Sequence, residues 1–316
     1  MEQQIAMMSN ENREMLLKQK RKNKTREFLF ILLVTAFPMM NFIVFYLYKN
    51  ASSIVLAFQE YDITHNLTWV GFQNFKVFFK DLFTPGNSYL IGLKNNVIAY
   101  LVSLLIFKPM QFALAFFIYK KATLGGTYRF VMMIPSIISS TVVALMFMRF
   151  INAIPLFMRT IGVNNFPKLL QDPRTRFGMT LFYDFWNGFG MTVIYYYNAM
   201  NRIDDEMIES AQLDGINYIK EFFFITFPMI FPTVTTFLIT GFSSIIGGSG
   251  PLYLFWKLDA PTDVYRFGYI LFRLTLKQGE TAYPLVAAIG LVTTCVMFPL
   301  TLLLRNVLER IDPNNE

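Results

Sequence analysis

The stretch "FLFILLVTAFPMMNFIVFYLY", residues 28–48, carries no charged side chain over its whole length. A helix of about 20 apolar residues crosses the hydrocarbon core of a bilayer. The apolar core of a cleavable signal peptide is shorter, about 7–15 residues. The stretch therefore predicts a membrane-spanning helix near the N-terminus rather than a leader that is removed.

The composition of the whole chain supports a membrane protein. Of its 316 residues, 54% are hydrophobic and 16% are charged, and the mean hydropathy is +0.41. Charged residues make up about 25% of a typical soluble domain. A soluble fold of this length could not cover so much apolar surface, so we expect membrane lipid to be its solvent.

Five further apolar runs are long enough to span a bilayer. Their patterns do not alternate as the strands of a membrane barrel would, so helices are favoured. We therefore predict an all-α integral membrane protein with six transmembrane helices, the later five being about Asn95–Tyr119, Phe130–Met148, Phe177–Met200, about Phe227–Gly248, and Ala282–Leu304.

Basic residues predict the orientation of these helices. The clusters "KQKRKNKTR" (18–26) and "YKKATLGGTYR" (119–129), with Arg305 and Arg310, all fall on one side of a six-span protein. The positive-inside rule makes that side cytoplasmic, so both termini are expected there. The expected organisation is a basic cytoplasmic arm (1–27), a permease-like transmembrane domain (28–310) and a cytoplasmic tail (311–316).

The rare chemistry-bearing residues exclude several classes of protein. The net charge of +7 comes from residues that flank the spans, which favours anchoring over nucleic-acid binding. One cysteine, Cys295, and one histidine, His65, argue against a metal site or a Ser–His catalytic pair. We expect neither a metal ion nor a catalytic residue.

A polar segment, "IESAQLDGINYIKEFFFITFP" (208–228), lies between two spans on the predicted cytoplasmic side. With the residues before it, it predicts a loop at about 201–228 that contains a short helix, a turn and a second helix. An apolar helix face outside the bilayer needs a partner groove. The alternative is an amphipathic connector that lies on the lipid headgroups.

The spacing within this segment resembles the conserved loop of binding-protein-dependent ABC importer permeases. That pattern is Glu-Ala-Ala, three residues, Gly, nine residues, Ile, any residue, Leu-Pro. This chain matches it from Glu209 to Pro228, with Ser210 and Phe227 as departures. Asp214 before Gly215 resembles the carbohydrate branch of the family.

Three other stretches also resemble that family, so that the likeness covers about residues 28–310. They are "VGFQNFKVFF" (70–79), "LKNNVIAYLVSLL" (93–105) and "MIPSIISSTVVALMF" (133–147). The most similar members are six-span permeases for sugars and oligosaccharides. The resemblance implies the type I ABC importer permease fold with cytoplasmic coupling helices, in a bacterial plasma membrane.

The resemblance also implies partners and a coupling site. A second permease, expected to be a different chain, would complete the pathway, two cytoplasmic ATPase subunits would bind ATP and Mg²⁺, and an extracytoplasmic solute-binding (lipo)protein would deliver the sugar. The residues implied in ATPase coupling are Glu209, Ser210, Ala211, Asp214 and Gly215. No G-x-x-x-x-G-K-[ST] phosphate-binding motif occurs here, so we expect no enzymatic activity in this chain.

Polar groups inside the spans are the candidates for the solute pathway, because such groups are costly in a membrane and often functional. The candidates are Ser136, Ser140, Asp184, Trp186, Asn187 and Ser244. The serines could instead bond backbone carbonyls of their own helices. Asp184 could pair with Lys108 as a structural ion pair or serve the pathway, and the sequence leaves both open.

Two functions of other classes remain as alternatives. A stand-alone secondary carrier would usually show more spans and an internal repeat. A membrane-embedded glycan or lipid transferase would need an acid cluster at the interface, and "IDDE" (203–206) is the only one in the sequence. The sequence does not identify the sugar.

Overall fold

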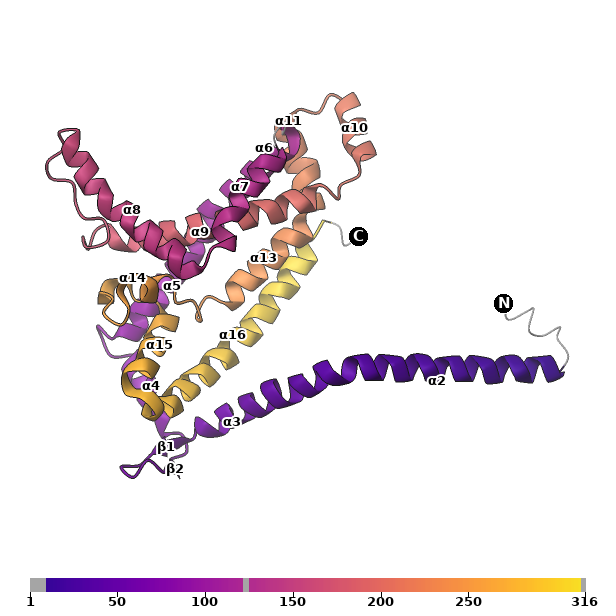
Figure 1. Cartoon of the computed structure of the whole chain (residues 1–316), viewed down its shortest axis with the longest axis horizontal. Coiled ribbons are helices and arrows are strands. Elements are labelled where there is room, and N and C mark those ends of the chain that lie inside the picture. The colour runs from indigo at the N-terminus through magenta and orange to yellow at the C-terminus, as the bar shows by residue number, and fades with distance from the viewer. Residues whose placement is uncertain (1–9, 122–124, 314–316) are drawn as a thin grey trace.

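The computed structural model describes residues 10–121 and 125–313, and the side chains of 22–120 and 126–313. Parts of the expected basic arm, the 119–129 connection and the tail lie outside these residues. The described chain is mainly helical, with one small hairpin (Figure 1).

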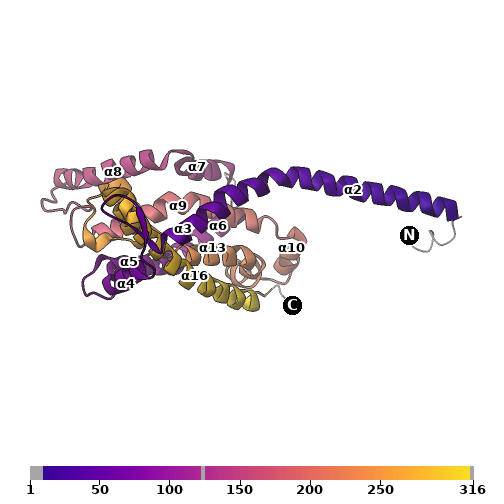
Figure 2. The same ribbon diagram turned by 90° about the horizontal axis from the view of Figure 1, so that it is seen from below.

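The first span is one long helix built from α2 (Asn10–Asn41), a π-helical segment η1 (Phe42–Tyr48) and α3 (Lys49–Leu56). Figures 1 and 2 both show α2 extending away from the other helices. Its described apolar side chains are exposed, whereas α3 packs against α16 (Tyr283–Ile311). The predicted span 28–48 therefore lies within a helix that its own chain leaves uncovered.

A hairpin and a short helix cap one end of the bundle, which we call the hairpin end. Strands β1 (Gln59–Tyr61) and β2 (Leu67–Trp69) pair antiparallel, and α4 (Gln73–Leu82) follows and packs against α16. The buried Asn74 side chain donates to the carbonyls of Ala57 and Gln59 at 3.0 and 2.8 Å, which ties α4 to the hairpin.

The second span contains α5 (Ser88–Val102), a π-helical turn η2 (Ser103–Phe107) and α6 (Lys108–Lys121). The Asn87 side chain caps it by accepting from the Tyr89 N–H at 3.0 Å. Its first half packs on α15 (Phe267–Gln278) and its second half on α9 (Arg176–Met200). The span thus bridges segments that are far apart in the sequence.

The third predicted span, Phe130–Met148, is broken in the structure. Helix α7 (Gly125–Ile137) contains Pro135 and ends before Ser139, whose ψ of 133° is extended, and α8 (Ser140–Thr160) then starts in a new direction (Figure 1). Proline removes a helical hydrogen bond and clashes with the preceding turn. The apolar run predicts one continuous helix here, whereas α7 continues past Pro135 to Ile137 and the break lies at the extended Ser139.

The segment after α9 contains α10 (Asp205–Leu213), α11 (Tyr218–Glu221), a π-helical turn η3 (Phe222–Thr226), α12 (Phe227–Met229) and α13 (Phe231–Ser243). The direction changes by 67° between Tyr218–Met229 and Phe231–Ser243. Pro228 and Pro232 flank this bend, and neither can donate a backbone hydrogen bond. The predicted fifth span is therefore a bent one.

The C-terminal part contains α14 (Leu252–Trp256), η4 (Thr262–Val264), α15, η5 (Gly279–Ala282) and α16. Helices α13 and α16 run side by side, as Figure 1 shows.

Within the described residues, four helical stretches are long and apolar enough to cross a membrane, or five when the bent pair is included. These are Lys22–Leu56, Ser88–Lys120, Ser140–Thr160 and Phe267–Ile311, with Tyr218–Ser243 as the bent pair. Helix α9 is long enough at 25 residues but carries Asp184, Asn187 and three consecutive tyrosines, which lower its apolarity. A multi-pass helical membrane protein is confirmed, and the number six stays a prediction.

Candidate functional site

Helix α10 forms the exposed end of the molecule opposite the hairpin end, as Figure 1 shows. Asp204 precedes it in extended conformation, and Asp205 and Glu206 lie in its first turn. Acidic side chains there are favoured by the partial positive charge of a helix N-terminus. The short helix predicted from "IESAQL" is therefore present, and its first turn has the composition that stabilises it.

A glycine ends α10 and turns the chain. Gly215 has φ +78°, a left-handed conformation that residues with a side chain rarely adopt. The Gly215 N–H donates to the Gln212 carbonyl at 3.0 Å and the Ile216 N–H to that of Ala211 at 3.2 Å. Asn217 then caps α11, its side chain accepting from the Lys220 N–H at 2.9 Å. The expected helix, turn and helix follow in that order.

Two apolar side chains hold α10 to the bundle. Ile203 and Ile208 are buried in a cluster with side chains of α6 and α9, among them Phe112, Tyr196 and Met200. Burying one such side chain contributes about 1.5–3 kcal/mol. The helix is therefore anchored on one face to the two helices that form this end of the bundle.

An ion pair anchors the following helix. Lys120 Nζ of α6 lies 2.5 Å from the Glu221 carboxylate of α11, and the Glu221 side chain is only 1% exposed. A buried carboxylate of this kind is stable only with a partner. The pair therefore ties the end of the second span to the segment that enters the fifth.

The motif residues lie mostly on the open face of this segment. Glu209, Ser210, Asp214 and Gly215 are exposed, and Ala211 is half-buried. Leu213, between them in the chain, is 89% exposed. The structure thus brings the five predicted coupling residues together at one projecting surface, and their binding to an ATPase stays a prediction.

A polar cavity of about 280 Å³ lies between the helices, toward the hairpin end. It is formed by the second span, by α9, by the end of α13 and by Arg266 just before α15. Its polar and charged lining residues are Asn96, Tyr100, Ser103, Lys108, Gln111, Asp184, Thr192, Ser244 and Arg266. A concave site with a few polar groups among apolar walls is typical of ligand pockets.

Asp184 is paired across this cavity. Its carboxylate accepts from the Arg266 guanidinium at 2.8 Å, and the Arg266 side chain is 7% exposed against 38% for Asp184. Among the described residues no ion pair joins Asp184 to Lys108. The sequence left the partner of Asp184 open, and the structure assigns it to an arginine that sequence reasoning missed.

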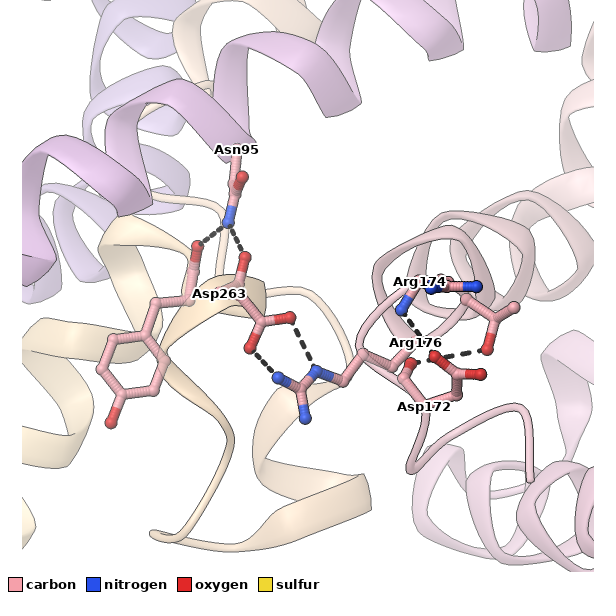
Figure 3. A network of polar contacts seen from close by, with 7 residues as sticks. Asn95, Asp172, Arg174, Arg176 and Asp263 are labelled. Atoms are coloured by element: carbon pink, nitrogen blue, oxygen red, sulfur yellow. Dashed lines mark hydrogen bonds and ion pairs between the residues drawn. The ribbon is translucent and has the colours of Figure 1, made fainter. Parts of the chain in front are cut away.

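A second network holds the segment before Arg266 in place (Figure 3). The Asn95 amide donates to the backbone carbonyls of Asp263 and Tyr265 at 2.7 and 2.8 Å. Arg176, at the start of α9, binds the Asp263 carboxylate through two nitrogens. Three elements are thereby fastened together, and Arg266 directly follows the segment that they hold.

Several buried polar atoms at the cavity have no hydrogen-bond partner in the described chain. The Asn96 amide donates to the Ile245 carbonyl at 2.5 Å, but its oxygen accepts nothing. The Gln111 amide oxygen and the Arg266 Nε are likewise unpaired. Leaving such a group unpaired costs about 1–3 kcal/mol. Because the chain itself covers these atoms, a solute in the cavity reaches them only where their side chains move.

A π-helical turn determines which residues of the second span face the cavity. Across η2, the Lys108 N–H donates to the Ser103 carbonyl, five residues earlier. Ser103, Phe107, Lys108 and Gln111 all line the cavity. Such single turns occur frequently at functional sites. The Lys108 ammonium also lies 4.8 Å from the centre of the Phe237 ring.

The other predicted pathway residues have different surroundings. Asp184 and Ser244 line the cavity, and the Ser244 hydroxyl donates to its own helix at Thr240 and Gly241. Trp186 packs against Phe147 of α8, with ring centres 5.7 Å apart, and lines a separate apolar hollow. Ser136, Ser140 and Asn187 do not line the polar cavity. Their part in a pathway stays a prediction.

Sequence reasoning missed six polar residues of the cavity, namely Asn96, Tyr100, Ser103, Gln111, Thr192 and Arg266, and two of them left a recognisable signal. Asn96 and Gln111 are amides within an apolar run. Because polar groups are costly inside a membrane, both could have been chosen as candidates for the pathway. Arg266 lies in a predicted outer loop next to the apolar "FGYILF". Nothing in the local sequence of Arg266 identifies Asp184 as its partner.

These features define a class: a multi-pass helical membrane protein with a polar cavity between its spans and a projecting surface helix, as solute transport requires. Residues 111–315, more than half of the chain, match the family described as "Binding-protein-dependent transport system inner membrane component". The chain belongs to this family and is a permease of such a transport system.

The named relatives of this chain are also permeases of transport systems. The chain is 25% identical over 285 residues to the arabinooligosaccharides transport system permease protein AraP of Bacillus subtilis, covering 86% of each chain. It is 26% identical over 258 residues to the polygalacturonan/rhamnogalacturonan transport system permease protein YteP of the same species, covering 76% of this chain and 77% of that one.

A solved structure has the same fold. A bacterial ABC transporter involved in the import of the acidic polysaccharide alginate contains a chain that superposes with a TM-score of 0.75 at 21% identity. The match covers 93% of this chain and 99% of the other.

Proposed function

We propose that this chain forms half of the translocation pathway of an ATP-driven importer for a sugar or oligosaccharide. The observation that carries the proposal is that helices α6 and α9 contribute both to the cavity and to the apolar cluster beneath α10. Their side chains line the polar cavity at Lys108, Gln111 and Asp184, and the same helices seat α10 through Phe112 and Tyr196. In this proposal a push on α10 is passed through that apolar cluster to two walls of the cavity.

The proposal that the solute is a sugar rests on the names of the relatives. The curated relatives are named for arabinooligosaccharides, polygalacturonan or rhamnogalacturonan, and galactooligosaccharides. The cavity suits a sugar because amide, hydroxyl and charged side chains line it among apolar walls.

The finer topology belongs to the same proposal. Six spans would consist of α2 with η1 and α3, the second span, the broken pair α7 and α8, α9, the bent α11–α13 segment, and α16. The α10 end would then be cytoplasmic with both termini, and the hairpin end would face outward to meet a solute-binding protein. A related importer was solved with its substrate-bound periplasmic protein.

The partners are inferred from the surfaces that this chain leaves open. The exposed apolar length of α2 supports contact with a second permease, since lipid or another helix must cover it. The projecting motif surface of α10 supports docking of an ATPase. ATP and Mg²⁺ would bind in two such ATPase subunits, and this chain would not hydrolyse ATP.

A site-directed cross-link tests the proposal. In a Cys295→Ser background, Glu209→Cys is placed on α10, and the complex is purified from native membranes after mild thiol cross-linking. We expect a covalent adduct with an ATPase subunit, identified by mass spectrometry. Ile63→Cys is the matched control, because Ile63 is 97% exposed at the opposite end and should not capture the ATPase.

Either alternative function would give another result. A stand-alone carrier or a membrane-embedded transferase would come out intact with no ATPase adduct at Glu209→Cys, although the position is exposed. That outcome would contradict the importer.

A further inference from the structure

The polar cavity carries more positive than negative charge. Lys108, Arg266 and Asp184 are its charged lining residues. Arg266 and Asp184 neutralise each other at 2.8 Å, which leaves the single charge of Lys108. Provided that the proposed import of a sugar holds, this remaining charge bears on the chemical class of that sugar.

Lys108 has no carboxylate within ion-pair distance in the part of the chain that the structure describes. Its nearest electrostatic partner there is the face of Phe237, 4.8 Å away. A cation–π contact contributes about 0.5–2 kcal/mol, less than the penalty of holding a lysine in a membrane span. This chain by itself therefore leaves the ammonium undercompensated, and an anionic group in the cavity would correct this.

The neighbours of Lys108 are suited to a sugar. Gln111 lies one helical turn further along the same face, and its buried amide oxygen is unpaired. The unpaired oxygen of Asn96 lies on the other side of the π-helical turn. Both side chains are more than nine-tenths buried and their oxygens are covered by the chain, so a sugar hydroxyl reaches them only after a small side-chain shift. Amide oxygens accept from hydroxyl groups, whereas an ammonium binds an anion.

We propose that the transported sugar carries a carboxylate, as a uronic acid does, and that Lys108 binds this carboxylate while Asn96 and Gln111 accept from hydroxyl groups. The charge favours a carboxylate over a phosphate ester. One carboxylate neutralises the one uncompensated lysine, whereas a phosphate monoester carries about −1.5 to −2 near pH 7 and would leave a new excess of negative charge.

The test uses the complete importer with its solute-binding protein. Oligosaccharides of galactose, glucose or mannose that carry a single terminal uronic acid are compared with their neutral counterparts, so that each acidic sugar has one carboxylate. ATP hydrolysis by the reconstituted complex and uptake into vesicles are measured. We expect an acidic oligosaccharide to stimulate both at least tenfold more than its neutral counterpart.

Three variants then test the lysine. Lys108→Met should lower uptake of the acidic sugar at least tenfold, and Lys108→Arg should retain most of it. Lys94→Met is the matched control, because Lys94 lies in the same span, is exposed and does not line the cavity. It should leave uptake unchanged, and the yield of assembled complex should be equal for all three.

Two results would overturn the inference in different ways. If a neutral oligosaccharide is imported and acidic ones are not, the carboxylate is wrong while the importer stands. The same holds if acidic sugars are imported equally by the wild type and Lys108→Met. If no sugar of either kind stimulates ATP hydrolysis, the proposed sugar import fails, and the carboxylate fails with it.

Discussion

At the scale of single residues, the buried ion pair Lys120–Glu221 joins the second span to the segment that follows α10. Glu221 is almost fully buried and lies 2.5 Å from Lys120. Removing one member of a buried pair costs about 3–5 kcal/mol, because the other charge is left uncompensated. Replacing both by neutral groups removes that penalty.

We therefore expect Lys120→Met to lower the thermal unfolding temperature of the purified complex strongly, and Lys120→Met with Glu221→Gln to restore most of it. The two changes should be clearly non-additive in a double-mutant cycle. Equal and additive losses would show that the pair does not act as a unit. Arg305→Met serves as the control, since its pair with Glu309 is exposed and contributes about 0–1 kcal/mol.

Gly215 occupies a position whose backbone conformation favours glycine. At φ +78°, an L side chain is strained by about 1–2 kcal/mol, although no neighbouring atom would obstruct a Cβ. We expect Gly215→Ala to weaken stimulation of ATP hydrolysis by loaded receptor several-fold, and Gly215→Asn to do so less, because Asn tolerates this conformation. Equal activity of Gly215→Ala and wild type would show that the turn is not needed for coupling.

At the scale of elements, a close crossing of helices places α7 against α9. A Cβ at Gly190 would lie 2.0 Å from the Met132 carbonyl oxygen, so no side chain fits there. Small residues permit this kind of approach between membrane helices. The broken third span is thus held against the helix that carries Asp184.

Gly190→Ala should force α7 and α9 apart and lower the thermal stability of the complex, as overpacking costs about 1–3 kcal/mol or more. Gly178→Ala in the same helix is the control, because a Cβ there meets nothing. It should be neutral or stabilising, since alanine favours a helix over glycine by about 1 kcal/mol. If both variants lost the same stability, the crossing would not be the cause.

At the scale of the whole molecule, α2 is a long apolar helix that the rest of the described chain leaves uncovered. The helix diverges from α16 in both views (Figures 1 and 2), and its described apolar side chains are exposed. Helix association in membranes depends on packing rather than on escape from water. A second permease subunit would supply that packing.

A thiol introduced by Phe37→Cys tests this arrangement. Phe37 is 70% exposed, and α2 diverges from α16, the helix that carries Cys295, so oxidation should form no bond between the two thiols of one chain. A short bifunctional cross-linker should instead join position 37 to the second permease in the assembled complex. A rapid bond to Cys295 within one chain would mean that α2 folds back onto its own bundle.

The local and periodic features of this chain were predictable from its sequence. The length of the apolar runs predicted the class of helical membrane proteins. The segment 201–228 predicted the helix, turn and helix, and its spacing from Glu209 to Pro228 predicted the family. These are properties of neighbouring residues: a hydrogen-bonded helix in lipid satisfies its own backbone, and Gly215 ends its helix locally. Pro135 was visible too, but whether a proline kinks or breaks a membrane helix depends on what packs beside it.

Which residues meet at the cavity depends on the tertiary structure alone. Asp184 and Arg266 are 82 residues apart, and Asn96 meets the Ile245 carbonyl across 149 residues. Such pairings depend on how separate helices cross, through contacts like that of Gly190 with Met132, and no local periodicity encodes them. For the same reason Trp186, close to Asp184 in sequence, packs on α8. Lys108, which the sequence offered as a partner of Asp184, lies at the cavity without a carboxylate partner among the described residues.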